Sequence, residues 1–346
     1  MAKRINPEAA QDWAQFTRRD FLATSASGLG MAALASLMQQ DNLLADTGNP
    51  LANIGPHFAP KAKRCIFIFM AGAPSHVDLF DPKPKLNELS GKPLPKEMTA
   101  NVRFAFIKKE SAVLMGTKRK FQPYGQCGTE VSDLLPHIGS VADDVALIRS
   151  MHTDQFNHHP GQLMMNTGSP LFGRPSVGSW LAYGLGSESK NLPSYVVLTA
   201  GRGSSGGASL WSSGFLPSNY QGVLFRNQGD PVLNLGNPPG ITREMQHYGL
   251  DAINDLNRMR LSAVGDPEIA SRIASYELAF RMQTAAPELM DLSGESQSTL
   301  NLYGAERKDN LKPGRGGPPG QFTKFARNCI LARRLVERGV RFVNLY

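Results

Sequence analysis

Two short polar segments carry the histidine and aspartate residues best suited to chemistry. His76 and Asp78 lie two positions apart, as do His152 and Asp154, and His158 follows the second pair. In an extended segment, side chains two positions apart can face the same way. Imidazole nitrogens and carboxylate oxygens are ordinary ligands of zinc and of related hydrolytic metals. The spacing therefore predicts a divalent metal site built from His76, Asp78, His152 and Asp154.

Each polar segment follows an apolar run that is expected to be a β-strand. The run from Cys65 to Met70 stops at Ala71-Gly72-Ala73-Pro74, and the run from Val145 to Ile148 stops at Arg149-Ser150. A continuous apolar run bounded by such residues is typical of a strand buried on both faces. Open α/β sheets collect chemistry beyond the carboxyl ends of their strands. We therefore expect the two polar segments to meet there.

The rest of the chain predicts strands that alternate with helices, which indicates a parallel sheet in an α/β fold. Strands are expected over residues 194–199 and 341–346. The expected helices are 132–141 with Ser132 as its cap, 176–183, one that begins at Asp266-Pro267, and one from Phe322 that stops at Gly339. Residues 201–240 are rich in Gly, Ser, Asn and Pro, which predicts a long functional loop.

Composition excludes several classes of protein. The chain has 346 residues, of which 41% are hydrophobic and 19% charged, so wholesale disorder is excluded. The formal charge of +8 suits an anionic substrate, but no Lys/Arg block is interleaved with aromatic residues, and nucleic-acid binding is not expected. Three widely spaced cysteines form neither a disulfide framework nor a zinc-finger pattern. We expect Cys65, Cys127 and Cys329 to be inert buried thiols.

The amino terminus predicts export. Arg18 and Arg19 precede an apolar, small-residue segment from Phe21 to Leu37 that is only weakly hydrophobic for a membrane span. Paired arginines before such a segment are typical of a Tat signal, here over residues 1–45 and followed by a linker over 46–60. The prediction is a periplasmic or extracellular protein that meets the Tat translocase and has no stable membrane span. The alternative is an amphipathic helix with a chance Arg-Arg pair.

A serine nucleophile is a weaker alternative. Residues 203–207 read Gly-Ser-Ser-Gly-Gly, which matches G-x-S-x-G with Ser205 at its centre. A nucleophile elbow needs a tight strand-turn-helix. The Gly/Ser-rich surroundings predict a flexible loop, and His247 is the only later histidine. No P-loop and no G-x-G-x-x-G before a helix is present, so a nucleotide cofactor is not expected.

Several long motifs, in order, resemble the DUF1501 proteins, which are exported bacterial proteins related to sulfatases and the alkaline phosphatase superfamily. The motifs are CIFIFMAGAPSHVDLFDPKP, ALIRSMHTDQFNHHPGQLMMNTG, RPSVGSWLAYGLG, ELAFRMQ and ILARRLVERGVRFV. The resemblance implies a three-layer α/β/α domain over residues 61–346 with a mostly parallel central sheet. It also implies an ester-hydrolase-like site that binds a divalent metal, among which zinc, calcium and manganese are not distinguished.

The resemblance places His158 where a sulfatase has its nucleophile. Residues 158–162 (His-His-Pro-Gly-Gln), with Thr167-Gly168, fall in the register of the sulfatase Cys/Ser-x-Pro-Ser-Arg motif. A formylglycine cannot form from histidine, so His158 is expected to act as metal ligand, general base or nucleophile, or to mark lost hydrolysis. Asn157 is its expected hydrogen-bonding neighbour. The superfamily aspartate at the tip of the first strand is missing at Ala71-Gly72, where Asp78 is a candidate replacement.

The resemblance also predicts that the chain is truncated after residues 341–346. Family members continue into segments with further aspartate and histidine residues, so the last strand is expected at an edge or unpaired. The expected function is that of an exported, metal-dependent hydrolase of anionic small-molecule or polysaccharide esters. The alternative is a non-catalytic periplasmic or envelope-associated binding protein with the same fold.

Replacing both Arg18 and Arg19 by Lys is expected to retain the protein in the cytoplasm, because Tat signals are read through the arginine pair. Cell fractionation followed by immunoblotting measures the result. Arg4→Lys is the matched control, since it makes the same exchange outside the pair and should leave export intact. Unchanged export of the double variant would contradict the Tat prediction.

Overall fold

A four-stranded parallel sheet forms the centre of this mixed α/β protein. The computed structural model describes residues 50–99, 108, 111–201, 204–226, 229–308 and 320–346. The predicted signal region, 1–45, lies outside them. The sheet has the order β1-β6-β4-β5. Its strands are β1 (Cys65–Ile68), β6 (Phe342–Leu345), β4 (Tyr195–Leu198) and β5 (Val223–Phe225).

Strand β6 is central, although we expected it at an edge or unpaired. Phe342 pairs with Cys65 of β1 on one side and with Tyr195 of β4 on the other. All four residues of β6 are buried. The expectation of an exposed last strand is therefore wrong, because β6 inserts between two strands that precede it in the chain.

Strand β1 was expected to be buried on both faces, and this is also wrong. Among the described residues no strand lies on its outer side, and Ile66 and Ile68 are 40% and 49% exposed. Only the alternate residues Phe67 and Phe69 pack against the core. The continuous apolar run therefore predicted the strand correctly but not its burial. An edge strand and a central strand can have the same apolar sequence.

The expected strand over Val145–Ile148 does not form. This segment is irregular, and Val145 and Ile148 are 45% and 65% exposed. The predicted loop over 201–240 instead contains β5 and two 3₁₀ helices, η3 (Gly207–Trp211) and η4 (Ser218–Tyr220). The strand prediction at Val145–Ile148 failed because a run of four apolar residues is too short for periodicity to identify a strand.

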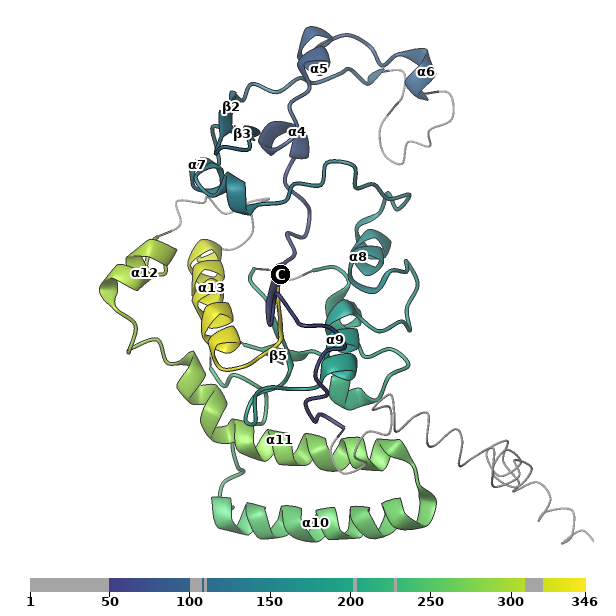
Figure 1. Cartoon of the computed structure of the whole chain (residues 1–346), viewed down its shortest axis with the longest axis vertical. Coiled ribbons are helices and arrows are strands. Elements are labelled where there is room, and N and C mark those ends of the chain that lie inside the picture. The colour runs from purple at the N-terminus through teal and green to yellow at the C-terminus, as the bar shows by residue number, and fades with distance from the viewer. Residues whose placement is uncertain (1–49, 100–107, 109–110, 202–203, 227–228, 309–319) are drawn as a thin grey trace, which may run out of the picture.

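Helices pack against both faces of the sheet (Figure 1). Val196, Leu198 and Val343 face a core shared with α11 (Pro267–Met290) and α13 (Gln321–Glu337). The alternate residues of the same strands face α8 (His158–Thr167) and α9 (Val177–Leu185). Gly178 of α9 lies so close that a Cβ there would be 2.6 Å from the Tyr195 ring and 2.7 Å from the Phe342 ring. Glycine at this position sets the distance between helix and sheet.

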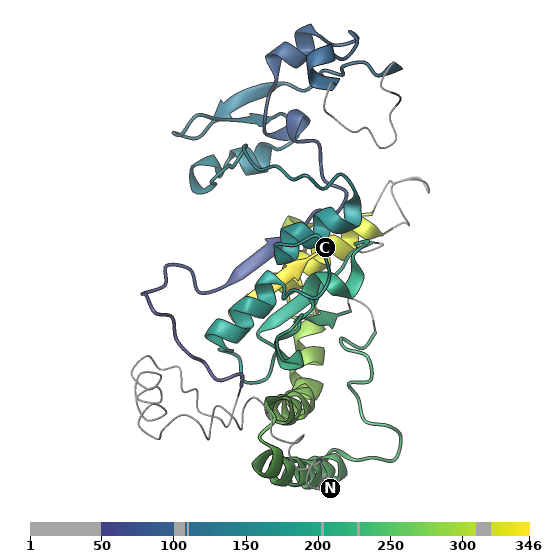
Figure 2. The ribbon, with the colours of Figure 1, turned by 90° about the vertical axis from the view of Figure 1, so that its right-hand side faces the viewer.

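Residues that follow β1 form a small lobe beyond the carboxyl end of the sheet (Figure 2). The antiparallel strands β2 and β3 pair within it. Its elements are α4 (His76–Leu79), α5 (Pro84–Glu88), α6 (Lys96–Thr99), β2 (Phe121–Tyr124), β3 (Thr129–Ser132), α7 (Pro136–Gly139) and η2 (Ala142–Asp144).

The helices α10 (Arg243–Val264) and α11 form a helical hairpin at the opposite end of the molecule, and α12 (Gln297–Tyr303) precedes α13. Within the described ranges no helix is both long and apolar enough to cross a bilayer.

The two predicted helix caps, Asp266 and Ser132, have different outcomes. The Asp266 carboxylate accepts the Glu268 amide at the start of α11, as predicted. At the start of α9 the Ser176 hydroxyl accepts the Ser179 amide, a cap that was not predicted. Ser132 instead ends β3, and α7 begins only at Pro136. All three cysteines are free, as expected, but Cys65 and Cys127 are exposed rather than buried.

Leu335→Ala is expected to destabilise the protein by about 2–5 kcal/mol, because it leaves a cavity in the core between α13 and the sheet. Leu335 is fully buried there. Leu302→Ala is the matched control, since the same atoms are removed from a side chain that is 84% exposed, and a change within about 0.5 kcal/mol is expected. Urea unfolding monitored by circular dichroism measures both, and equal effects would contradict the assigned core.

Candidate functional site

The first predicted pair, His76 and Asp78, lies on the short helix α4. Successive residues of a helix turn by about 100°, so side chains two positions apart point to nearly opposite sides. The extended geometry on which the pairing of His76 with Asp78 rested is therefore wrong. His76 is exposed and Asp78 is half-buried.

The Asp78 carboxylate joins α4 to the segment that precedes β2. The Thr117 hydroxyl donates a short hydrogen bond to Oδ1 of Asp78. This bond lowers the pKa of Asp78 most strongly, followed by a hydrogen bond from Ser75, and the charge of Arg119 adds to the effect. The carboxylate is thus ionised at neutral pH, but a protein donor already occupies one of its oxygens.

Asp81 links the two polar segments electrostatically. Its Oδ2 lies 2.8 Å from Nζ of Lys83. That hydrogen bond lowers the pKa of Asp81 most, and the charges of Lys83, Arg149 and His76 lower it further. Asp81 follows α4, whereas Arg149 begins the second polar segment, so the fold brings the two segments near one carboxylate.

The second predicted pair lies on irregular, exposed chain. His152 and Asp154 are both exposed, and within the described ranges neither side chain makes a hydrogen bond or ion pair. His158 is the first residue of α8, and Oδ1 of Asn157 accepts its backbone amide at 2.9 Å. Asn157 therefore caps the helix rather than binding the His158 ring.

The next residue, His159, is more enclosed than His158. Its ring lies edge-on to Phe172 at 5.1 Å, and its buried Nε2 has no hydrogen-bond partner among the residues that the structure describes. Both imidazoles belong to the first turn of α8, where the helix dipole favours negative charge. This part of the structure therefore suits an anion better than a cation.

The described residues do not by themselves complete a metal site. Among them no three histidine, cysteine, aspartate or glutamate side chains lie together in a way that could hold an ion. The assignment of His76, Asp78, His152 and Asp154 as metal ligands therefore stays a prediction.

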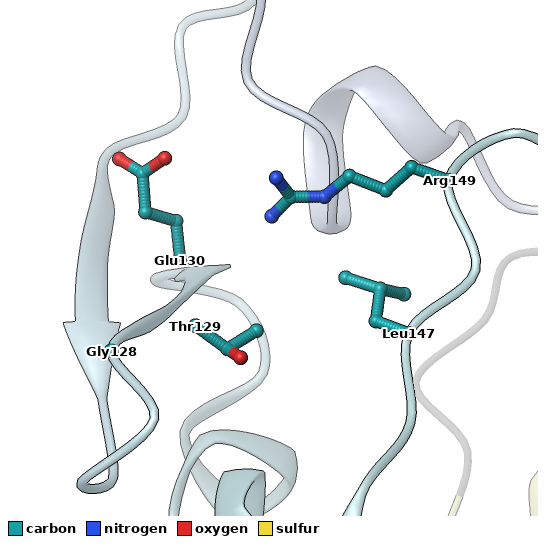
Figure 3. Close-up of a pocket in the computed structure, with 5 residues that line it drawn as sticks. All are labelled: Gly128, Thr129, Glu130, Leu147 and Arg149. Atoms are coloured by element: carbon teal, nitrogen blue, oxygen red, sulfur yellow. The ribbon is translucent and has the colours of Figure 1, made fainter.

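A pocket of about 350 Å³ opens between the β2–β3 hairpin and the segment that leads to Arg149 (Figure 3). Glu130 projects from β3 on one side, and the side chains of Arg149 and Leu147 project from the other side. Gly128 and Thr129 complete the lining. Arg149 was not among the predicted site residues, although its place at the end of an apolar run was a usable signal.

The Ser205 hydroxyl is bonded to an amide oxygen of α8 and, among the described residues, not to a catalytic base. Its hydroxyl donates to Oε1 of Gln162 at 2.9 Å, and the Gly206 amide donates to the same oxygen at 3.0 Å. A nucleophilic serine instead donates to a base such as histidine. The geometry of Ser205 is that of a loop anchored on α8.

A buried polar network at the end of β6 escaped sequence reasoning. Asn344 donates to the Tyr346 hydroxyl at 2.6 Å, and that hydroxyl donates to Oδ1 of Asn166 at 2.8 Å. Tyr195 also borders Asn344, and burial raises the pKa of Tyr195 to about 12. Oδ1 of Asn344 has no partner. The available signal was a single Asn in an apolar strand.

Comparison with known proteins adds one finding. A family model described as "Protein of unknown function (DUF1501)" matches residues 62–346. No curated protein and no solved structure matches the chain.

Thr117→Val is expected to raise the pKa of Asp78 toward its ordinary value, because the main hydrogen bond to the carboxylate is lost. Asp78 has a depressed pKa in the folded state, so its stabilising effect is present above the unfolded pKa and is lost as the pH falls through the folded one. NMR titration of the aspartate carboxyl carbons measures the shift. Thr323→Val is the control, because Thr323 bonds the distant Arg307 carbonyl. An unchanged Asp78 titration would contradict the assigned bond.

Proposed function

The chain belongs to the DUF1501 family, and from this premise we propose that it is an exported, sulfatase- or phosphatase-like protein that acts on anionic esters. The proposal includes an alkaline phosphatase-like, three-layer α/β/α arrangement. A parallel sheet with helices on both faces supports that arrangement. The twin arginines at Arg18 and Arg19 support passage through the Tat translocase to the periplasm or the exterior.

The observation that carries the proposal is the pocket in which Arg149, at the start of the second polar segment, faces the β2–β3 hairpin of the lobe that follows β1. The charge of Arg149 also lowers the pKa of Asp81 in the first polar segment, so both segments lie beyond the carboxyl end of β1, where parallel α/β sheets bind their ligands. A guanidinium matches the planar oxygens of phosphate, sulfate or carboxylate groups. The net charge of +8 also favours binding of anionic small molecules or polysaccharides.

His158 is the proposed catalytic group, with Asn157 as the residue that fixes its helix. The imidazole lies at the exposed start of α8, where the helix dipole favours an approaching anion. Neutral imidazole can remove a proton from water or attack an ester directly. Positioning of the anion by Arg149 and proton removal by His158 are steps that residues of this chain can supply.

Metal dependence forms a separate part of the proposal. His76, Asp78, His152 and Asp154 are the candidate ligands, and zinc, calcium and manganese all accept nitrogen or oxygen donors. Among the described residues no three histidine, cysteine, aspartate or glutamate side chains lie close enough together to hold an ion, so these four residues do not form a complete metal site. No step of the reaction is therefore assigned to a metal.

The same missing ligand set favours a second candidate function. A non-catalytic periplasmic or envelope-associated binding protein could keep the fold and bind an anion through Arg149 without a metal. Such a protein needs a basic contact and a helix amino terminus but no nucleophile.

Purified protein is expected to hydrolyse p-nitrophenyl phosphate or sulfate, and His158→Ala is expected to lower kcat by about 10²-fold or more, because a positioned acid–base group contributes that much. His137→Ala is the matched control, since His137 lies on α7 outside both polar segments. Elemental analysis of the protein before and after chelation, with activity measured in parallel, tests metal dependence.

Three results separate the alternatives. Hydrolysis that chelation abolishes and that falls only in His158→Ala supports the metal-dependent hydrolase. Hydrolysis unaffected by chelation but lost in His158→Ala supports an imidazole-based hydrolase and removes the metal. Anion binding by calorimetry without hydrolysis, lost in Arg149→Ala, overturns the enzyme in favour of the binding protein.

A further inference from the structure

Helix α10 exposes an apolar stripe along its outer side. Met245, Tyr248, Leu256 and Met259 are 54%, 65%, 66% and 69% exposed. With Ala252 between them, they recur at spacings of three or four residues and so share one face of the helix. The α10–α11 hairpin lies at the end of the molecule farthest from the polar lobe, with α10 outermost (Figures 1 and 2). The stripe is therefore distinct from the candidate site.

The inner side of α10 mixes amides with two leucines. The side chains of α10 that are not exposed are Gln246, Leu250, Asn254, Asn257 and Leu261. Gln246, Asn254 and Asn257 each bury a side-chain atom that has no hydrogen-bond partner among the described residues. The Asn254 amide nitrogen makes only a long hydrogen bond of 3.5 Å to Oε1 of Glu277 on α11. The outer stripe is therefore more continuously apolar than the inner side, and a partner that covers it would bury more apolar surface than α11 does.

We propose that the stripe on α10 is the interface of a homodimer, in which it packs antiparallel against the same stripe of a second copy. The stripe is symmetric about Ala252. Met245 and Met259 lie seven positions before and after Ala252, and Tyr248 and Leu256 lie four positions before and after it. A two-fold axis at Ala252 therefore places methionine opposite methionine and Tyr248 opposite Leu256, as an isologous interface requires. The small Ala252 side chain lets the two helices approach at the axis.

The charges beside the stripe favour the antiparallel orientation. The amino-terminal half carries Glu244 and Asp251, while its Arg243 is turned toward Thr284 and Phe280 of α11. The carboxyl-terminal half carries Arg258 and Arg260 with one acidic residue, Asp255. Antiparallel packing places the half with net negative charge against the half with net positive charge, whereas parallel packing would place like net charges together. Arg258 is already paired with Asp255 at 2.9 Å, while Arg260 makes no ion pair within the described residues. Arg260 is thus available to an acidic partner.

The same charges disfavour a lipid surface as the occupant. Helices that lie on membranes concentrate Lys and Arg on their polar face. On α10 the basic residues are balanced by Glu244, Asp251 and Asp255. A second copy of the chain satisfies both the apolar stripe and its mixed charges.

Sedimentation velocity over a range of concentrations tests the proposal. The unmodified protein is expected to dimerise, and the double variant Leu256→Glu/Met259→Glu is expected to weaken dimerisation at least about thirtyfold, as loss of a central interface contact does. Leu302→Glu is the matched control, because it adds the same charge at an exposed leucine of α12. Circular dichroism confirms that each variant keeps its helices, and this readout is independent of any hydrolase activity.

Cysteine cross-linking tests the orientation. In a background with the three native cysteines replaced by serine, Ala252→Cys is expected to form a disulfide-linked dimer. Met245→Cys mixed with Met259→Cys is expected to cross-link better than either variant alone. A protein that stays monomeric, a dimer that survives the double glutamate variant, or a monomer that binds anionic vesicles through α10 would each overturn the proposal.

Discussion

The parallel pairing of β6 with strands on both sides is the constraint on which the fold depends. β6 spans Phe342–Leu345 and holds together β1 and β4, which lie far earlier in the chain. Contacts of such large sequence separation form only after a large loop has closed, so the sheet cannot be completed until the last helix has docked. The position of the polar segment after β1 follows from this pairing. The geometry of that segment therefore depends on residues more than 250 positions away from it in the sequence.

A buried amide in this central strand gives the pairing its specificity. Asn344 is fully buried, and its amide group bonds the hydroxyl of Tyr346. Slippage of β6 by one residue would turn Asn344 to the apolar side of the sheet, against α13. A buried polar group without a partner there would cost about 1–3 kcal/mol of stability. In the observed register it faces Asn166 of α8 and Tyr195 of β4 instead. The network thus favours one alignment of strand and helix. Burial raises the pKa of both tyrosines, so both hydroxyls stay protonated, and that of Tyr346 donates to Asn166.

Sequence reasoning found the elements whose signals are local. Asp266 was identified as a helix cap because a capping side chain acts on amides two or three residues away. The helix near residues 176–183 and the strand at Tyr195–Leu198 were also foreseen. The runs at Cys65 and Val145 look alike in the sequence, yet one forms an edge strand and the other forms none, because tertiary pairing decides between them. His76 and Asp78 were paired on the assumption of extended chain, and a four-residue helix was enough to separate them. The charge interaction between Asp81 and Arg149 joins positions 68 residues apart, and no local pattern encodes it.

The charges at the carboxyl end of β1 constrain what can bind there. Asp78 and Asp81 both have a lowered pKa, but hydrogen bonds from Thr117 and Lys83 cause most of the effect on each. Carboxylates already engaged in this way are poor free ligands for a cation, since a metal would have to displace their donors. Arg149, in contrast, lines a pocket of about 350 Å³ opposite Glu130, and its charge acts on Asp81 over a longer range. A guanidinium there and the dipole at the start of α8 both favour negative charge, so these charges fit the proposed anionic ligand better than they fit a cation held by Asp78 and Asp81.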